Sequence, residues 1–105
     1  MTWAHMMDVP QPIEMYDQVQ AEVEKQLGRP LHPECLLHMV TQTDTGFRVT
    51  EVWESHEAAD RFGDEVLQPI IGRVVGQQVL EQGPPPTEEL HLHRLFSREN
   101  TPAAV

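Results

Sequence analysis

The sequence predicts a small α+β domain whose elements follow the order β-α-β-β-α-β. Residues 13–27 carry apolar side chains every three or four positions, which is the spacing of one helix face. Residues 35–41 and 47–54 are strand-like and flank a Thr-Asp-Thr-Gly tract, which indicates a β-hairpin. Strand-like patterns also occur at the start of the chain and after the Gly-Pro-Pro-Pro tract at residues 83–86. A length of 105 residues fits one such domain.

The first half of the chain has clear boundaries. A strand at 2–9 should stop at Pro10, because proline cannot donate to a sheet ladder. Pro12 suits the first turn of the helix at 13–27, where a missing N–H costs nothing. Gly28 is a typical C-terminal stop for that helix.

The hairpin turn has two candidate geometries. A two-residue turn would need positive φ at Thr45, which a β-branched residue resists. We therefore expect a three-residue loop with Gly46 in the left-handed conformation, which pairs Thr43 with Phe47.

This register decides which side chains share a face of the sheet. It places Glu51 and Trp53 on one face and His38 on the other. A slip of one residue would exchange these partnerships, so the neighbours of His38 depend on the turn.

The second half of the chain is expected to hold a long, interrupted helix and a last strand. Ser55 is a good N-cap for the helix. Pro69 should kink or split it, with a looser continuation to about residue 82. The break at residues 83–86, Gly-Pro-Pro-Pro, precedes a strand at 89–97.

Right-handed crossovers turn this order into the ferredoxin-like arrangement, a four-stranded antiparallel sheet with two helices on one face. The domain would span 1–97, and 98–105 would be a flexible tail. The strands carry apolar side chains for both faces of the sheet. The face without helices should therefore be covered by a second copy, giving a homodimer.

Composition narrows the partners and the compartment. The 17 acidic and 7 basic side chains give a net charge of -10, which argues against nucleic acids and anionic membranes as partners. No apolar run approaches the ~20 residues of a membrane helix, and no secretory signal is recognisable. Cys35 is the single cysteine, so no internal disulfide can form and a cytoplasmic protein is expected.

One tract carries a family resemblance. Residues 46–55 read Gly-Phe-Arg-Val-Thr-Glu-Val-Trp-Glu-Ser, and a helix with an aromatic at Phe62 and the tract Val-Leu-Gln-Pro at 66–69 follow. With the element order, these features resemble the dimeric α+β barrel superfamily, which includes the antibiotic biosynthesis monooxygenase-like proteins, over residues 2–97. The resemblance implies a homodimer without a metal or flavin cofactor in its oxygenase members. Other members are isomerases, cyclases or haem-degrading enzymes.

Haem degradation is disfavoured by the same comparison. Haem-degrading members use an asparagine on the first strand and a tryptophan and a histidine on the second helix. Here the first strand has no asparagine, the tryptophan position looks like Phe62, and the histidine region reads Ile71-Gly72-Arg73.

Histidines are the strongest candidates for chemistry, because imidazole moves protons near neutral pH. Four of the six lie on expected strands: His5, His38, His91 and His93. The last strand neighbours the first in this fold, so His5 could approach His91 or His93. We expect His38 or the His91/His93 pair to be the catalytic base. The alternative is that these histidines are half-buried polar groups or barrel-interface residues.

A metal site is a weaker hypothesis. His91 and His93 have a spacing known in metal sites, but no complete set of ligands is recognisable, so no metal is expected.

Glu51 and Trp53, with His5 and Phe62, are the expected substrate-binding residues. A carboxylate among apolar residues must be paired, protonated or at a cavity edge. Glu51 could then act as a base with a raised pKa. The alternative is that Trp53 is core packing and Glu51 pairs with an arginine such as Arg94.

Two functions follow. The first is a small tailoring enzyme of secondary metabolism that acts on an apolar cyclic or polyketide-like molecule. Its chemistry would be cofactor-independent oxygenation or acid/base catalysis of the cyclase or isomerase type. The second is a non-catalytic homodimer of the same fold that binds a small molecule or has a regulatory role. An open, histidine-lined space between sheet and helices would favour the enzyme, whereas a space filled by Phe62, Trp53, Val66 and the methionines would disfavour it.

Overall fold

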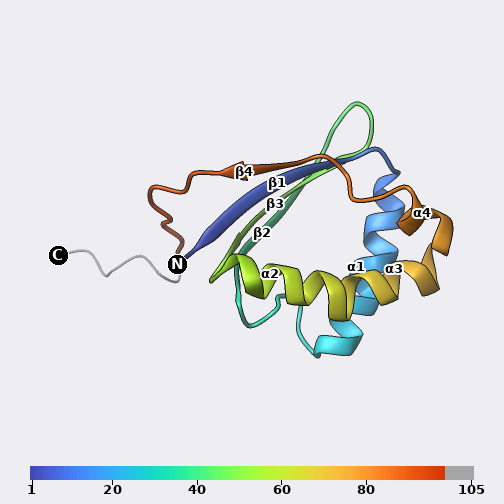
Figure 1. Ribbon diagram of the computed structural model, residues 1–105, viewed down its shortest axis with the longest axis horizontal. Coiled ribbons are helices and arrows are strands. Elements are labelled where there is room, and N and C mark those ends of the chain that lie inside the picture. The colour runs from blue at the N-terminus through green and yellow to red at the C-terminus, as the bar shows by residue number, and fades with distance from the viewer. Residues whose placement is uncertain (99–105) are drawn as a thin grey trace.

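The computed structural model describes residues 1–98 and confirms the predicted ferredoxin-like fold (Figure 1). The antiparallel sheet has the order β2-β3-β1-β4. Its strands are β1 (Trp3–Val9), β2 (Cys35–Gln42), β3 (Phe47–Trp53) and β4 (Thr87–Leu90). The helices are α1 (Ile13–Leu27), α2 (His56–Phe62), α3 (Gln68–Val74) and α4 (Gln77–Glu81), with the π-helical segment η1 (Gly63–Leu67) between α2 and α3.

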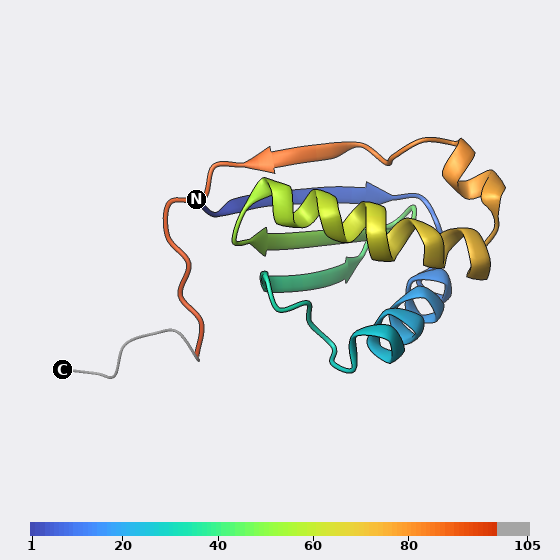
Figure 2. The ribbon, with the colours of Figure 1, turned by 60° about the horizontal axis from the view of Figure 1, so that its bottom comes forward.

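The helices cover one face of the sheet (Figure 2). Helix α1 has the predicted bounds and ends at Gly28, whose φ of 71° is left-handed as expected. Val19 and Val23 on α1 pack with Ile70 of α3 and form one buried cluster. The proposed tail at 98–105 lies, apart from Arg98, outside the described residues.

The second helix begins and breaks for the predicted reasons. The Ser55 hydroxyl accepts a hydrogen bond from the N–H of Ala58 at 3.1 Å. Ahead of Pro69 the helix widens into η1, where the N–H of Gln68 donates to the carbonyl of Gly63, five residues back. Proline has no N–H to continue the normal ladder, and its ring crowds the preceding turn. The looser continuation is broken at Gly76, whose φ of 130° separates α3 from α4.

The predicted hairpin register is wrong by one residue. Gln42, not Thr43, pairs with Phe47, so the loop holds four residues and Thr43 N–H donates to the carbonyl of Gly46 at 2.9 Å. Gly46 is not left-handed. His38 therefore pairs with Glu51 and shares its face of the sheet.

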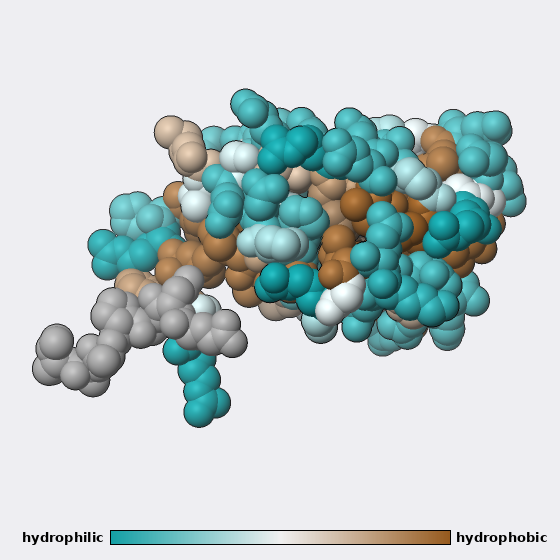
Figure 3. Space-filling view, turned by 90° about the horizontal axis from the view of Figure 1, so that it is seen from below, coloured by the Kyte–Doolittle hydropathy of each residue, from teal (hydrophilic) through white to brown (hydrophobic). Residues whose placement is uncertain are grey.

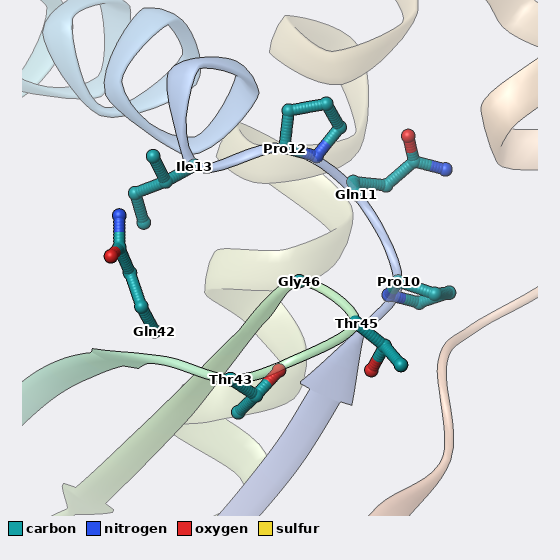
Figure 4. Close-up of a pocket in the computed structure, with 8 residues that line it drawn as sticks. All are labelled: Pro10, Gln11, Pro12, Ile13, Gln42, Thr43, Thr45 and Gly46. Carbon is teal, nitrogen blue, oxygen red and sulfur yellow. The ribbon is translucent and has the colours of Figure 1, made fainter.

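Gly46 is required by a close approach of two backbones. A Cβ atom on it would lie 2.0 Å from the carbonyl oxygen of Val9 and 2.8 Å from the nitrogen of Gln11. The connection between β1 and α1 thus packs directly on the hairpin loop, and a shallow pocket of about 440 Å³ lies at this junction (Figure 4).

The predicted last strand, 89–97, is wrong at both ends, since β4 begins two residues earlier, at Thr87, and is shorter. β4 ends at Leu90, which pairs with Ala4, and the residues after it are not in a strand. The same register would set His91 against Trp3, the first residue of β1, so the backbone beyond has no partner. Leu92 and Phe96 are instead 37% and 61% exposed.

We expect the Gly46→Ala substitution to destabilise the fold by about 1–3 kcal/mol, because the new methyl group overlaps the β1–α1 backbone. Chemical denaturation measures the change. Gly63→Ala is the matched control, since its Cβ would meet nothing within 4 Å, and it should be neutral or stabilising. Equal stability of the two variants would contradict this account of Gly46.

Candidate active site

A row of three polar residues crosses the middle of the sheet on the face toward the helices. Glu51 of β3 is flanked by His38 of β2 and by His5 of β1, each directly opposite it in the strand register. Glu51 is 8% exposed and His5 7% exposed, so the row lies inside the protein.

The Glu51 carboxylate accepts hydrogen bonds from three donors. His38 Nδ1 lies 2.6 Å from Oε2, His5 Nε2 lies 2.9 Å from Oε1, and the Trp53 indole N–H donates to Oε1 at 3.0 Å. An ionised carboxylate can only accept, so both imidazoles must carry the proton on the nitrogen that faces it. Glu51 therefore fixes the tautomer of each histidine.

Tyr16 of α1 extends this row. Its hydroxyl oxygen lies 2.6 Å from His38 Nε2. Because the proton of a neutral His38 sits on Nδ1, Nε2 accepts from the Tyr16 hydroxyl. Tyr16, His38 and Glu51 thus form a continuous hydrogen-bonded chain, which we call the relay.

The two ends of the relay, Glu51 and Tyr16, have pKa values shifted in opposite directions. Burial raises the pKa of Glu51, but hydrogen bonds from His38, His5 and Trp53 outweigh it and, with the attraction of His38 in its protonated form, lower the pKa from 4.5 to about 2. Burial, then the negative charge of Glu51, raises the pKa of Tyr16 to about 12. At neutral pH the carboxylate is ionised and the phenol keeps its proton. The predicted raised pKa of Glu51 is therefore wrong.

The relay lies in the wall of a cavity between the sheet and the helices. The cavity has a volume of about 920 Å³. From the helix side, hydrophobic residues show between hydrophilic margins (Figure 3). Four histidines line the cavity: His5, His32, His38 and His56. The space is open and histidine-lined, which is the arrangement that favours an enzyme.

Aromatic rings frame one end of the cavity. Trp53 and Phe62 have ring centroids 5.3 Å apart, and His32 packs against both at 5.4 Å. Trp3 is stacked between His5 at 4.5 Å and His56 at 4.1 Å. These rings give the cavity flat aromatic surfaces.

The structure brings together most of the predicted site residues. His38, Glu51, His5 and Trp53 are in one hydrogen-bonded group, and Phe62 contacts Trp53. His91 and His93 are exposed in the segment after β4 and do not line the cavity, because β4 ends before them.

The contacts exclude the alternative pairing of Glu51 with Arg94 and show the surroundings of the single cysteine. Glu51 pairs with histidines, while Arg94 lies over the ring of Phe96 at 5.8 Å. Cys35 is buried, its thiol donates to the carbonyl of Leu37 at 3.2 Å, and burial, then the charge of Glu51, raises its pKa to about 12. Its sulfur is therefore a poor nucleophile.

Tyr16 was missed from the sequence because it falls on the apolar stripe of its helix. Its spacing from the other apolar residues of α1 is that of a core residue, and only the tertiary fold shows that its hydroxyl reaches His38.

Comparison with solved structures identifies one relevant likeness. A "putative antibiotic biosynthesis monooxygenase" from Caulobacter crescentus CB15 matches over 89% of each chain, with a TM-score of 0.55 and 18% sequence identity. The two proteins share one fold. The resemblance inferred from the sequence is thereby confirmed as a structural likeness, and identity this low extends it no further than the fold. No protein-family model and no curated protein matches the chain.

The described residues offer neither a metal-binding group nor a helix long and apolar enough to span a membrane. Within residues 1–98, no group of three or more His, Cys, Asp or Glu side chains is arranged to hold a metal ion. None of the helices in this range has the length and apolar character needed to cross a bilayer.

The low pKa of Glu51 predicts a specific loss of stability in acid. Its folded-state pKa lies below its ordinary value, so its contribution is full above pH 4.5 and is lost as pH falls toward 2. The shift corresponds to about 3 kcal/mol. Glu51→Gln should therefore lose less stability than the wild type between pH 6 and pH 2.5 in urea titrations.

The exposed Glu54 on the same chain segment supplies the control. Glu54→Gln should follow the wild-type pH dependence. A Glu51→Gln variant with that same dependence would show that Glu51 is not held ionised by its partners.

Proposed function

We propose that the protein is a small enzyme that moves protons to and from an apolar cyclic molecule bound between the sheet and the helices. The observation that carries the proposal is the relay in the cavity wall. A buried ionised carboxylate costs several kcal/mol unless donors surround it, and apolar residues could fill a merely structural core at no such cost. Perturbed acid and base groups beside a cavity are typical of catalytic sites.

In the proposed reaction, the substrate gives a proton to the Tyr16 oxygen while the Tyr16 proton passes to His38 Nε2. His38 becomes an imidazolium ion next to Glu51, which stays ionised because of its low pKa. This is the logic of a catalytic triad, in which the carboxylate orients the imidazole and stabilises its positive form. The reverse transfer returns the proton.

The fate of the substrate anion decides the reaction type. If the proton returns to another carbon, the net result is an isomerisation or a ring closure. If the anion gives electrons to dioxygen, the two combine into a hydroperoxide that takes up the proton and loses water, which leaves a carbonyl group. Dioxygen is then the oxidant and the source of the new oxygen atom. Both routes need only the relay for proton transfer, and the fold neighbour's description as a monooxygenase supports the second.

Deuterium exchange tests the proton transfer without knowledge of the natural substrate. The probe is 2-tetralone, an apolar bicyclic ketone with acidic C–H bonds, followed by NMR in D₂O. We expect the wild type to catalyse exchange, and His38→Ala and Tyr16→Phe to lose it by about 10²–10⁴-fold.

His91→Ala is the matched control, because this histidine is exposed and lies outside both the relay and the cavity lining. It should keep the wild-type exchange rate. Full activity in His38→Ala would overturn the proposal and favour a binding protein. An oxygen electrode with the same probe distinguishes oxygenation from isomerisation.

We also propose that the protein is a homodimer in which a second copy covers the outer face of the sheet. Met39 pairs with Thr50 and Thr50 with Met6, so these three side chains form a row on the face away from the helices. Met39 is 47% exposed and neighbouring Leu36 39% exposed. Such apolar side chains on a sheet face are typical of an interface.

Sedimentation equilibrium tests the dimer. The wild type should have the mass of two chains, and Met39→Glu should shift it to one, because a charge buried between two sheets is unpaired. Gln18→Glu adds the same charge on exposed α1 and should remain dimeric. A monomeric wild type at all concentrations would exclude the dimer.

A further inference from the structure

Apart from the histidines, the ionisable side chains that line the cavity are carboxylates and therefore negatively charged. The lining includes four carboxylates and, within residues 1–98, no lysine or arginine. The carboxylates are Glu51 on β3, Asp60 on α2, Asp64 on η1 and Glu89 on β4. A ligand therefore meets negative charge from the sheet and from the helices.

The arginines with ion pairs face elsewhere. Arg48 binds Asp8 at 2.8 Å, Arg61 binds Glu34 at 3.2 Å and Arg73 approaches Glu22 at 3.6 Å. None of these arginines lines the cavity. Among residues 1–98, no arginine or lysine is thus placed to neutralise an anionic ligand in the cavity.

A second observation concerns His5. Its Nε2–H is committed to Glu51, which leaves the lone pair of Nδ1 as a hydrogen-bond acceptor. Among the described residues this Nδ1 is the buried side-chain nitrogen or oxygen without a partner, and His5 is 7% exposed in the cavity wall. An unpaired buried acceptor costs stability, which a hydrogen-bond donor on a ligand would recover.

We infer that the cavity takes an apolar molecule that is neutral or cationic and carries an O–H or N–H donor, and that it rejects carboxylates, phosphates and sulfonates. The inference rests on the proposed function in using this cavity as the substrate site. An anion would lose its hydration and meet carboxylates without a fixed cation. A consequence is that the preceding reaction must release the substrate as a free neutral or cationic molecule, because phosphate-bearing carriers do not fit.

Three matched probes test the inference by calorimetric titration at pH 7. They share a naphthalene ring and differ in one group: 2-naphthalenemethanol is neutral, 2-naphthalenemethanamine is cationic and 2-naphthoic acid is anionic. The alcohol and the amine should bind at least about tenfold more tightly than the acid. Equal or tighter binding of the acid would overturn the inference, as would the absence of binding by all three probes.

Variants locate the source of the preference. Asp64→Asn should narrow the difference between amine and acid, because it removes a carboxylate from the lining. Glu65→Gln is the matched control, since the next residue is exposed and does not line the cavity. A change in Glu65→Gln as large as in Asp64→Asn would show that net charge, not the cavity wall, sets the preference.

The two proposals fail in distinguishable ways. Charge-selective binding without deuterium exchange of 2-tetralone would leave the inference standing and end the proposed catalysis. Exchange that depends on His38, together with tight binding of 2-naphthoic acid, would support the proposed catalysis and overturn the inference on charge.

Discussion

The ionised carboxylate of Glu51 is the interaction on which the site depends. A buried negative charge is tolerated only where donors replace water, and here they come from both neighbouring strands and from Trp53 two residues along. Each donor constrains something else. His38 and His5 are held in one tautomer, and Trp53 is fixed at the end of the cavity. The geometry of this hydrogen-bonded group therefore follows from the need to satisfy one buried charge.

That arrangement exists in only one register of the hairpin. A slip of one residue would carry His38 to the outer face and leave Glu51 with one imidazole fewer. The register is secured at a distance, because the loop at Gly46 packs on the backbone between Val9 and Gln11. A contact between two loops, at a glycine that leaves no room for a side chain, thus helps to position the hydrogen-bonded relay.

The sequence predicted what local chemistry decides. The bounds of α1, its stop at Gly28, the Ser55 cap and the disturbance ahead of Pro69 each follow from a few neighbouring residues. The hairpin register does not follow from neighbouring residues alone. A three-residue and a four-residue loop are both compatible with the local sequence, and the packing of Gly46 on the β1–α1 connection favours the four-residue loop. The strand pattern around His91 and His93 failed for another reason: the alternation continues in the sequence, but β4 begins early, at Thr87, and pairs with β1 only as far as Leu90. Tyr16 was not predicted as a site residue, because a hydrogen-bonded tyrosine and a core tyrosine occupy the same positions on the apolar face of a helix.

The acidic cavity and the relay fit together in one further respect. In the proposed reaction, deprotonation turns a neutral substrate into an anion, which the carboxylates around it disfavour. The positive charge that stabilises this anion arises only when His38 accepts the proton. Because no lysine or arginine lines the cavity within the described residues, the attraction is absent in the ground state and present as the proton moves. Interactions that strengthen toward the transition state accelerate a reaction, whereas a fixed cation would also hold an anionic product. A wall without arginine or lysine is thus consistent with catalysis by a histidine that becomes charged only during the reaction.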